Sequence, residues 1–140
     1  MKVPVKPILL ALLLVAADQI TKAVTEGKSY MLGSVGIDYV VNRGAAFGVM
    51  QGWNWLLIGV SFAVIGWIAI YYHKEKSRLM RYALVFIFSG TFGNLIDRLS
   101  LGYVRDFIAI GAWPNFNIAD SLNVIGVALV MLTLIRREMK

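Results

Sequence analysis

Two aspartates, Asp106 and Asp120, stand beside apolar segments in the last third of the chain. Asp106 lies in GYVRDF, which follows an apolar segment that ends in GNLIDR, and Asp120 lies in FNIAD, where the final apolar run begins. A carboxylate at membrane depth is energetically expensive and therefore usually marks a functional site. Two carboxylates that meet at one face of a bilayer suggest an acid–base pair.

Other polar residues interrupt the apolar runs at helical spacings. Asp18 and Lys22 are four residues apart and share one helix face, as an interfacial anchor or as part of a site. Asn94, Asp97 and Arg98 also share a face. Asp97 and Arg98 alone fit a solvated helix end, but Asn94 needs a hydrogen-bonding partner on another helix or in a polar cavity.

Simpler structural roles compete for the two aspartates. Asn117 is a good candidate for a helix N-cap, which places Asp120 at the third helical position, where a carboxylate suits the helix dipole. Asp106 also fits an ordinary loop aspartate paired with Arg105. Neither role explains why Asn94 and Asp106 are polar at the same depth.

The composition indicates a membrane protein. Of the 140 residues, 59% are hydrophobic, against about 45–50% in a typical soluble domain. Cysteine is absent and His73 is the single histidine, which excludes thiol nucleophiles, thiolate metal sites and a His-rich metal site. The net charge of +6 does not indicate nucleic-acid binding, because the basic residues cluster at the ends of apolar runs, where they set membrane orientation.

We expect one membrane α-helical domain, residues 1–140, with four transmembrane helices. The apolar runs cover about 8–24, 53–72, 82–96 and 118–135, and the first and third are short. Lys and Arg gather before the first run, between the second and third, and after the fourth. This predicts cytoplasmic N- and C-termini, with the loops around 25–52 and 97–117 facing outward.

The outer segment, about 30–50, is rich in glycine and β-branched residues. Val35, Ile37, Tyr39 and Val41 alternate with other residues, which predicts a small periplasmic β-sheet cradle between helices 1 and 2.

An alternative interpretation makes the N-terminus a cleaved signal peptide. Lys2 and Lys6 would be its basic region, ILLALLLVAA its apolar region, and Val15-Ala16-Ala17 its cleavage site. Cleavage would leave three membrane spans and would place the C-terminus on the opposite side of the membrane.

Five sequence blocks carry a family resemblance. They are DQITK at 18–22, NRGAAFG at 42–48, GNLIDR at 93–98, GYVRDF at 102–107 and FNIAD at 116–120. In this order they resemble bacterial lipoprotein signal peptidase, or signal peptidase II, a family of four-helix inner-membrane aspartyl proteases. The glycine pair usual before GNxxDR is Ser89-Gly90 here.

The resemblance implies that Asp106 and Asp120 form the catalytic dyad. It also implies that the following residues shape the site or contact substrate: Asp18, Lys22, Asn42, Gly44, Asn94, Asp97, Arg98, Asn117 and Ala119. The implied substrate is a prolipoprotein with diacylglycerol on its cysteine, cut just before that cysteine. The implied inhibitor is the cyclic peptide globomycin. The resemblance implies no metal, cofactor or nucleic acid, and it implies that membrane lipid is a partner of the chain.

Three other interpretations are open. Asp18, Asp97 and Asp120 could relay protons in a small proton-coupled transporter or channel, although the polar residues crowd at one side of the membrane. A Ser–Lys dyad of Lys22 with Ser29 or Ser34 has no supporting motif. A non-catalytic scaffold subunit leaves the Asn–Asp clustering unexplained.

Overall fold

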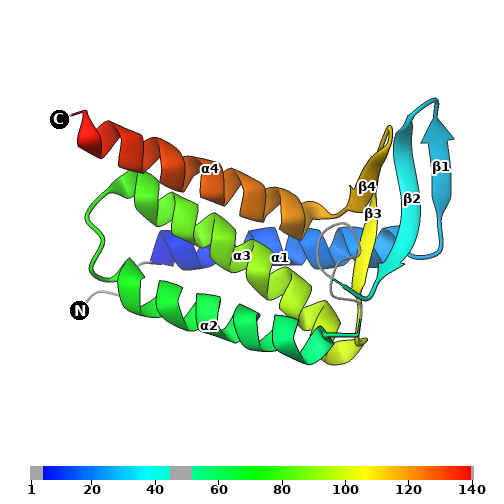
Figure 1. The fold of residues 1–140 in the computed structure, drawn as a ribbon, viewed down its shortest axis with the longest axis horizontal. Helices are drawn as coiled ribbons and strands as arrows, with labels where there is room; N and C mark the ends of the chain where they lie inside the picture. Colours follow the sequence, from blue (N-terminus) through cyan, green and yellow to red (C-terminus); the bar gives the residue numbers. More distant parts are fainter. Residues whose placement is uncertain (1–4, 45–51, 140) are drawn as a thin grey trace.

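The helices of this chain lie side by side, and a small sheet lies across one end of them (Figure 1). A computed structural model describes residues 5–44 and 52–139. Over these residues the helices are α1 (Val5–Thr25), α2 (Asn54–Tyr72), α3 (Arg78–Ser100) and α4 (Ile118–Glu138). The strands are β1 (Ser29–Leu32), β2 (Val35–Asn42), β3 (Val104–Ile110) and β4 (Trp113–Phe116).

Within residues 5–44 and 52–139, four helices are long and apolar enough to cross a membrane, which confirms the predicted fold class. At about 1.5 Å per residue, helices of this length match the roughly 30 Å hydrocarbon core of a bilayer. Large apolar side chains such as Leu12, Trp55 and Val124 point outward and are more than half exposed, as lipid-facing residues are. α3 is central and packs against α1, α2 and α4.

The third helix is longer than predicted. The apolar run predicted 82–96, but α3 covers Arg78–Ser100, which is 23 residues. The start is extended because Ser77 caps the helix, its side-chain oxygen accepting a hydrogen bond from the backbone N–H of Met80 at 3.3 Å. The apolar run stops before Asp97, but the helix continues past this residue because ion pairs with Lys22 and Arg105 stabilise the buried carboxylate.

The sheet is antiparallel, with the order β1-β2-β3-β4. The prediction that the sheet lies between helices 1 and 2 is therefore incomplete, since β3 and β4 come from the connection between α3 and α4. Arg105 and Asp106 interrupt the apolar sequence of β3, so the sequence did not predict this strand. β3 forms because its backbone groups hydrogen-bond those of β2. Residues 45–50 of the predicted outer segment, together with residue 51, lie outside the described residues.

The pairing of β2 with β3 brings distant parts of the chain together. Asn42 lies opposite Val104, and Val40 lies opposite Asp106. β4 then leads directly into α4, which places the start of that helix beside β3. The sheet therefore holds Asp106 near the N-terminus of α4, at the end of the bundle opposite the start of α1 and the end of α4 (Figure 1).

Candidate active site

The N-terminus of α4 is a capping box. The side-chain oxygen of Asn117 accepts a hydrogen bond from the backbone N–H of Asp120 at 2.9 Å, and Asp120 Oδ2 accepts one from the backbone N–H of Asn117 at 3.2 Å. The predicted N-cap is confirmed. Capping uses one oxygen of Asp120 and leaves the other for a second partner.

Asn117 also connects the two aspartates. Its amide nitrogen donates to Asp106 Oδ1 at 2.7 Å, while its backbone N–H donates to Asp120. Asp106 Oδ2 accepts from Asn42 Nδ2 at 2.9 Å, and Asp120 Oδ1 accepts from Asn94 Nδ2 at 2.8 Å. Each carboxylate is thus oriented by amide groups, which add no charge to the site.

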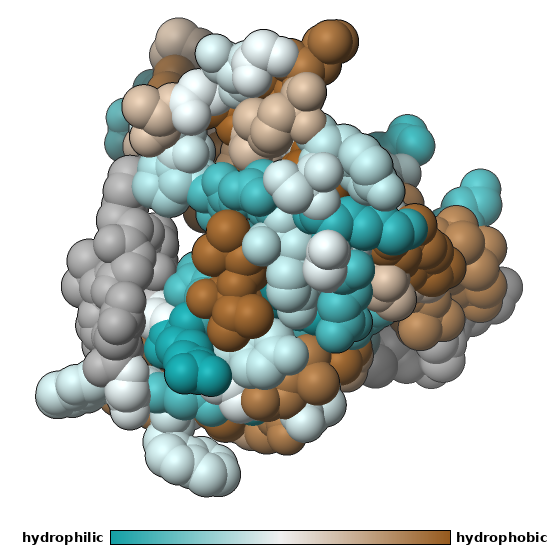
Figure 2. All heavy atoms as spheres, turned by 90° about the vertical axis from the view of Figure 1, so that its right-hand side faces the viewer, coloured by the Kyte–Doolittle hydropathy of each residue, from teal (hydrophilic) through white to brown (hydrophobic). Residues whose placement is uncertain are grey.

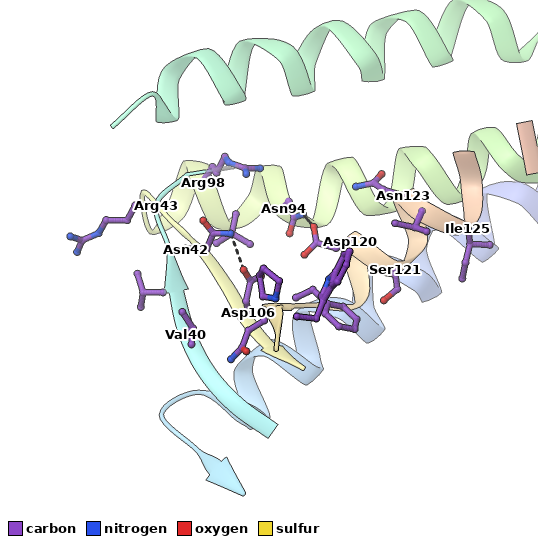
Figure 3. Close-up of a pocket in the computed structure, with 17 residues that line it drawn as sticks. Val40, Asn42, Arg43, Asn94, Arg98, Asp106, Asp120, Ser121, Asn123 and Ile125 are labelled. Carbon is purple, nitrogen blue, oxygen red and sulfur yellow. Dashed lines mark hydrogen bonds between the residues drawn. The ribbon is translucent and has the colours of Figure 1, made fainter. Parts of the chain in front are cut away.

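The two aspartates line one cavity of about 1000 Å³. Figure 3 shows Asp106 on β3 and Asp120 on α4, with Asn42 and Asn94 beside them. Arg98 lines the same cavity and donates to the backbone oxygen of Gly44 at 3.3 Å. In Figure 2, which looks onto the sheet end, hydrophilic residues gather across the middle of the face on either side of a hydrophobic patch, and further hydrophobic residues lie toward the edges.

The environment of Asp106 favours its protonated form. Burial, first, and the nearby charge of Asp120 raise the pKa of Asp106 to about 7, although the hydrogen bonds from Asn42 and Asn117 oppose the shift. A carboxyl group with a pKa near 7 can hold or release a proton under ordinary conditions. Asp106 can therefore exchange a proton near neutral pH.

Beneath the two aspartates lies a network of buried charges. Lys22 Nζ contacts Asp18 Oδ2 at 2.9 Å, Asp97 Oδ2 at 3.4 Å and Asn94 Oδ1 at 2.9 Å, and the Lys22, Asp18 and Asp97 side chains are fully buried. The predicted Asp18–Lys22 ion pair therefore lies in the protein interior. An ammonium has three N–H donors and all three are engaged here, which argues against a Ser–Lys dyad.

Ala119 and Gly44, which the resemblance also implies, act through their backbone N–H groups. The buried backbone N–H of Ala119 donates to Asp18 Oδ1 at 2.9 Å, which ties α1 to the start of α4. The backbone N–H of Gly44 donates to Asn42 Oδ1 at 2.9 Å and thereby orients the amide toward Asp106. α1 therefore belongs to the site.

The sequence did not mark Gln19 as a site residue. The alternative in which Arg105 pairs with Asp106 is wrong. Arg105 Nη2 donates to Asp97 Oδ1 at 2.8 Å and to Gln19 Oε1 at 3.1 Å, and Gln19 Nε2 donates to the backbone oxygen of Gly93 at 3.0 Å. Both residues fall inside the motif blocks DQITK and GYVRDF, which was the available signal. Gly93 is also required, because a methyl group there would lie 2.6 Å from Asp18 Oδ2.

Comparisons with known proteins agree with this architecture. A lipoprotein signal peptidase of Halothermothrix orenii is 38% identical over 138 residues, 93% of this chain and 95% of that protein. One of Syntrophomonas wolfei is 42% identical over 129 residues, 86% of this chain and 87% of that protein.

A solved structure described as a bacterial membrane enzyme, at 2.3 Å resolution, superposes with a TM-score of 0.90 and 31% identity, covering 95% of this chain and 89% of that one. A second, at 1.9 Å, has a TM-score of 0.82 and 30% identity, covering 94% and 93%. The family model described as signal peptidase (SPase) II matches residues 10–136. With this match over most of its length, the chain belongs to the signal peptidase II family.

Proposed function

We propose that this chain is an aspartic endopeptidase in which Asp106 and Asp120 activate the water that hydrolyses the peptide bond. Family membership makes the chain a peptidase that removes signal peptides from prolipoproteins. The proposal adds that the substrate carries diacylglycerol on a cysteine and that the bond cut is the one just before that cysteine.

One observation carries the proposal. Asp106 and Asp120 come from different elements, line the same cavity and share Asn117 as a hydrogen-bond donor. Neighbouring carboxyl groups do not readily both ionise, so such a pair shares one proton. That state supplies a base and an acid at the same place.

The chemistry follows from the shared proton. The ionised carboxylate takes a proton from water, and the oxygen of that water attacks the scissile carbonyl carbon. The protonated carboxyl polarises the carbonyl oxygen, and a proton then passes to the leaving amine nitrogen as the C–N bond breaks. Exclusion of bulk water from the cavity strengthens each of these interactions.

Polar residues in and beside the cavity hold this geometry. Asn42, Asn94 and Asn117 orient the carboxylates, and Arg98 binds the chain at Gly44. The Asp18–Lys22–Asp97 cluster fixes α1 against α3 beneath them. A site whose reactive groups are locked by such second contacts stays within the narrow tolerance that catalysis requires.

The proposed location is the bacterial inner membrane, with the site at the outer face. The α2–α3 connection and the end of α4 lie at the end of the bundle opposite the sheet (Figure 1). These segments contain Lys74, Lys76, Arg81 and Arg137, and basic residues favour the cytoplasmic side. A diacylglyceryl chain can then stay in the lipid while its cysteine reaches the cavity. Cyclic peptides of the globomycin type would occupy the same cavity and compete with substrate.

The test is cleavage by purified protein of a prolipoprotein that carries the diacylglyceryl group, beside the same prolipoprotein without it. We expect a mature product from the lipid-modified form alone, cut before the cysteine, as read by mass spectrometry. Equal cleavage of both forms, or cleavage at another bond, would overturn the substrate assignment. Movement of protons into liposomes without any cleavage would favour the proton-coupled transporter or channel.

A further inference from the structure

A second polar pair, Asn123 and Thr91, lies beyond the two aspartates, and Asn123 of this pair lines the cavity. Asn123 lies on α4, three residues after Asp120, which is about 4.5 Å further along the helix axis and away from the sheet. Figure 3 shows Asn94, Asp120 and Asn123 in succession along α3 and α4. The hydroxyl of Thr91 on α3 donates to Asn123 Oδ1 at 3.3 Å.

The helix does not require an asparagine at this position. Asn117 and Asp120 already complete the capping box, so Asn123 has no part in starting α4. Its neighbours Val124 and Ile125 are 70% and 46% exposed and belong to a helix that is long and apolar enough to cross a membrane. A polar amide beside such residues is unfavourable unless it is hydrogen-bonded.

In the structure, the side-chain oxygen of Asn123 has a hydrogen-bond partner. Thr91 occupies Oδ1, and Gly90 leaves the space for it, because a methyl group at Gly90 would lie 2.7 Å from Asn123 Oδ1. Among residues 5–44 and 52–139, Asn123 accepts this hydrogen bond at Oδ1 and its Nδ2 donates none. Asn123 lines the cavity, so a molecule that enters the cavity can reach this donor.

We propose that Asn123, held by Thr91, binds a carbonyl oxygen of the substrate on the membrane side of the scissile bond. This inference rests on the proposed function. The substrate offers two kinds of carbonyl there: the esters that join the acyl chains to glycerol, and the peptide carbonyls of the departing signal peptide. Both accept the hydrogen bond that the amide nitrogen of Asn123 can donate.

The test compares two substrates and three variants. The substrates are prolipoproteins with an ester-linked diacylglyceryl group or an ether-linked dialkylglyceryl group, which lacks the carbonyls. The variants are Asn123→Leu, Thr91→Val and, as a matched control, Thr133→Val. Thr133 lies on α4, and its hydroxyl donates to the backbone oxygen of Leu129 at 2.7 Å, within its own helix.

Loss of one hydrogen bond made equally in the ground and transition states raises KM and leaves kcat unchanged. We expect Asn123→Leu to raise KM about fivefold and Thr91→Val about twofold, as the loss of a hydrogen bond of ordinary strength would. We expect Thr133→Val to leave KM unchanged. An increase on the ester substrate alone identifies an ester carbonyl, and an equal increase on both substrates identifies a peptide carbonyl.

Two results would overturn the inference. One is a KM that stays at the wild-type value in Asn123→Leu and Thr91→Val on both substrates. The other is a lower kcat with unchanged KM, which would mean that the contact forms only in the transition state, or a lower thermal unfolding midpoint that accounts for the loss, which would indicate a packing role. If the wild-type protein cleaves neither substrate, the proposed function itself fails, and that result is separate from either of these.

Discussion

The two ends of the helical bundle bury different kinds of side chain. At the sheet end, the Asp18, Lys22 and Asp97 side chains are fully buried. At the opposite end, Ile68, Met80, Ala83 and Leu84 form an apolar cluster. Buried ion pairs seldom stabilise a protein more than apolar packing of the same volume does. The charges at the sheet end are therefore better explained by function than by stability.

Each end also contains a buried carboxylate outside the helices, and the two behave oppositely. Glu75 accepts hydrogen bonds from the backbone N–H groups of Lys76 and Ser77, from the hydroxyl of Tyr71 and from Arg137 at 2.5 Å. Burial raises its pKa, but these donors outweigh burial and the pKa is lowered. Asp106 has amide donors and a neighbouring carboxylate, and its pKa is raised.

This contrast separates a structural carboxylate from a reactive one. Glu75 stays ionised and joins the α2–α3 connection to the end of α4. Asp106 has a raised pKa, so its carboxyl group can gain or lose a proton near neutral pH. Substitutions at the two ends should therefore have different effects on activity and on stability.

The largest effect is expected at Asp106 and Asp120. Asp106→Asn and Asp120→Asn each remove one member of the acid–base pair, so cleavage should fall by about 10²–10⁴-fold or below detection. Processing of a lipid-modified prolipoprotein on a gel measures this. The control is Asp38→Asn on β2, whose carboxylate hydrogen-bonds Asn115 at 3.2 Å and belongs to no motif, and we expect it to be nearly silent.

Substantial activity in either dyad variant would show that the assignment of the pair is wrong. A dead Asp38→Asn protein with normal expression would show that the ranking of these aspartates is wrong.

Lys22→Met should be the most destabilising single change in the buried network. It leaves Asp18 and Asp97 without their shared cation, and breaking a buried pair in this way costs about 3–5 kcal/mol. Tryptophan fluorescence during thermal unfolding in detergent measures the change. Lys28→Met removes the same charge from an exposed side chain and should be close to neutral, so equal unfolding midpoints for the two variants would contradict the proposed contribution of the network.

The pH dependence should differ between the two ends. The pKa of Asp106 rises from 3.8 to about 7 on folding, so the native state binds this proton more tightly than the unfolded state. The stability that Asp106 contributes is full below its unfolded pKa and is lost as the pH rises through about 7. The free energy of unfolding should therefore decline less over that interval in Asp106→Asn than in the wild type.

Wild-type activity should decline above about pH 7 for the same reason, because the pair then loses its shared proton. A rate that stays constant from about pH 7 to 9, measured at saturating substrate, would exclude a protonated carboxyl from the mechanism.

The smallest effect is expected at the far end. Glu75→Gln should cost about 1–3 kcal/mol of stability, the usual cost of weakening buried hydrogen bonds to a charged group, and leave kcat unchanged. Because the pKa of Glu75 is lowered, its contribution is present above the unfolded value of 4.5 and is lost as the pH falls through the folded value. Glu138→Gln, at an exposed position of α4, is the control, and a reduced kcat in Glu75→Gln alone would mean that the two ends are coupled.

The sequence alone determined the features that depend on neighbouring residues. Apolar runs marked the membrane helices because hydropathy is a property of a contiguous stretch. The capping box could be read because Asn117 and Asp120 are three residues apart. The motif blocks marked Asp106 and Asp120, and Asn94 was informative by itself because an amide in an apolar run needs a partner.

Only the tertiary structure decided which distant groups meet. β3 pairs with β2 although Asn42 and Asp106 are 64 residues apart, and the Asp18 carboxylate accepts from Ala119, 101 residues away. Arg105 adjoins Asp106 in sequence yet pairs with Asp97, because successive side chains of a strand point to opposite faces. Spacing along a chain gives the face on which a side chain lies, whereas its partner depends on the packing of whole elements.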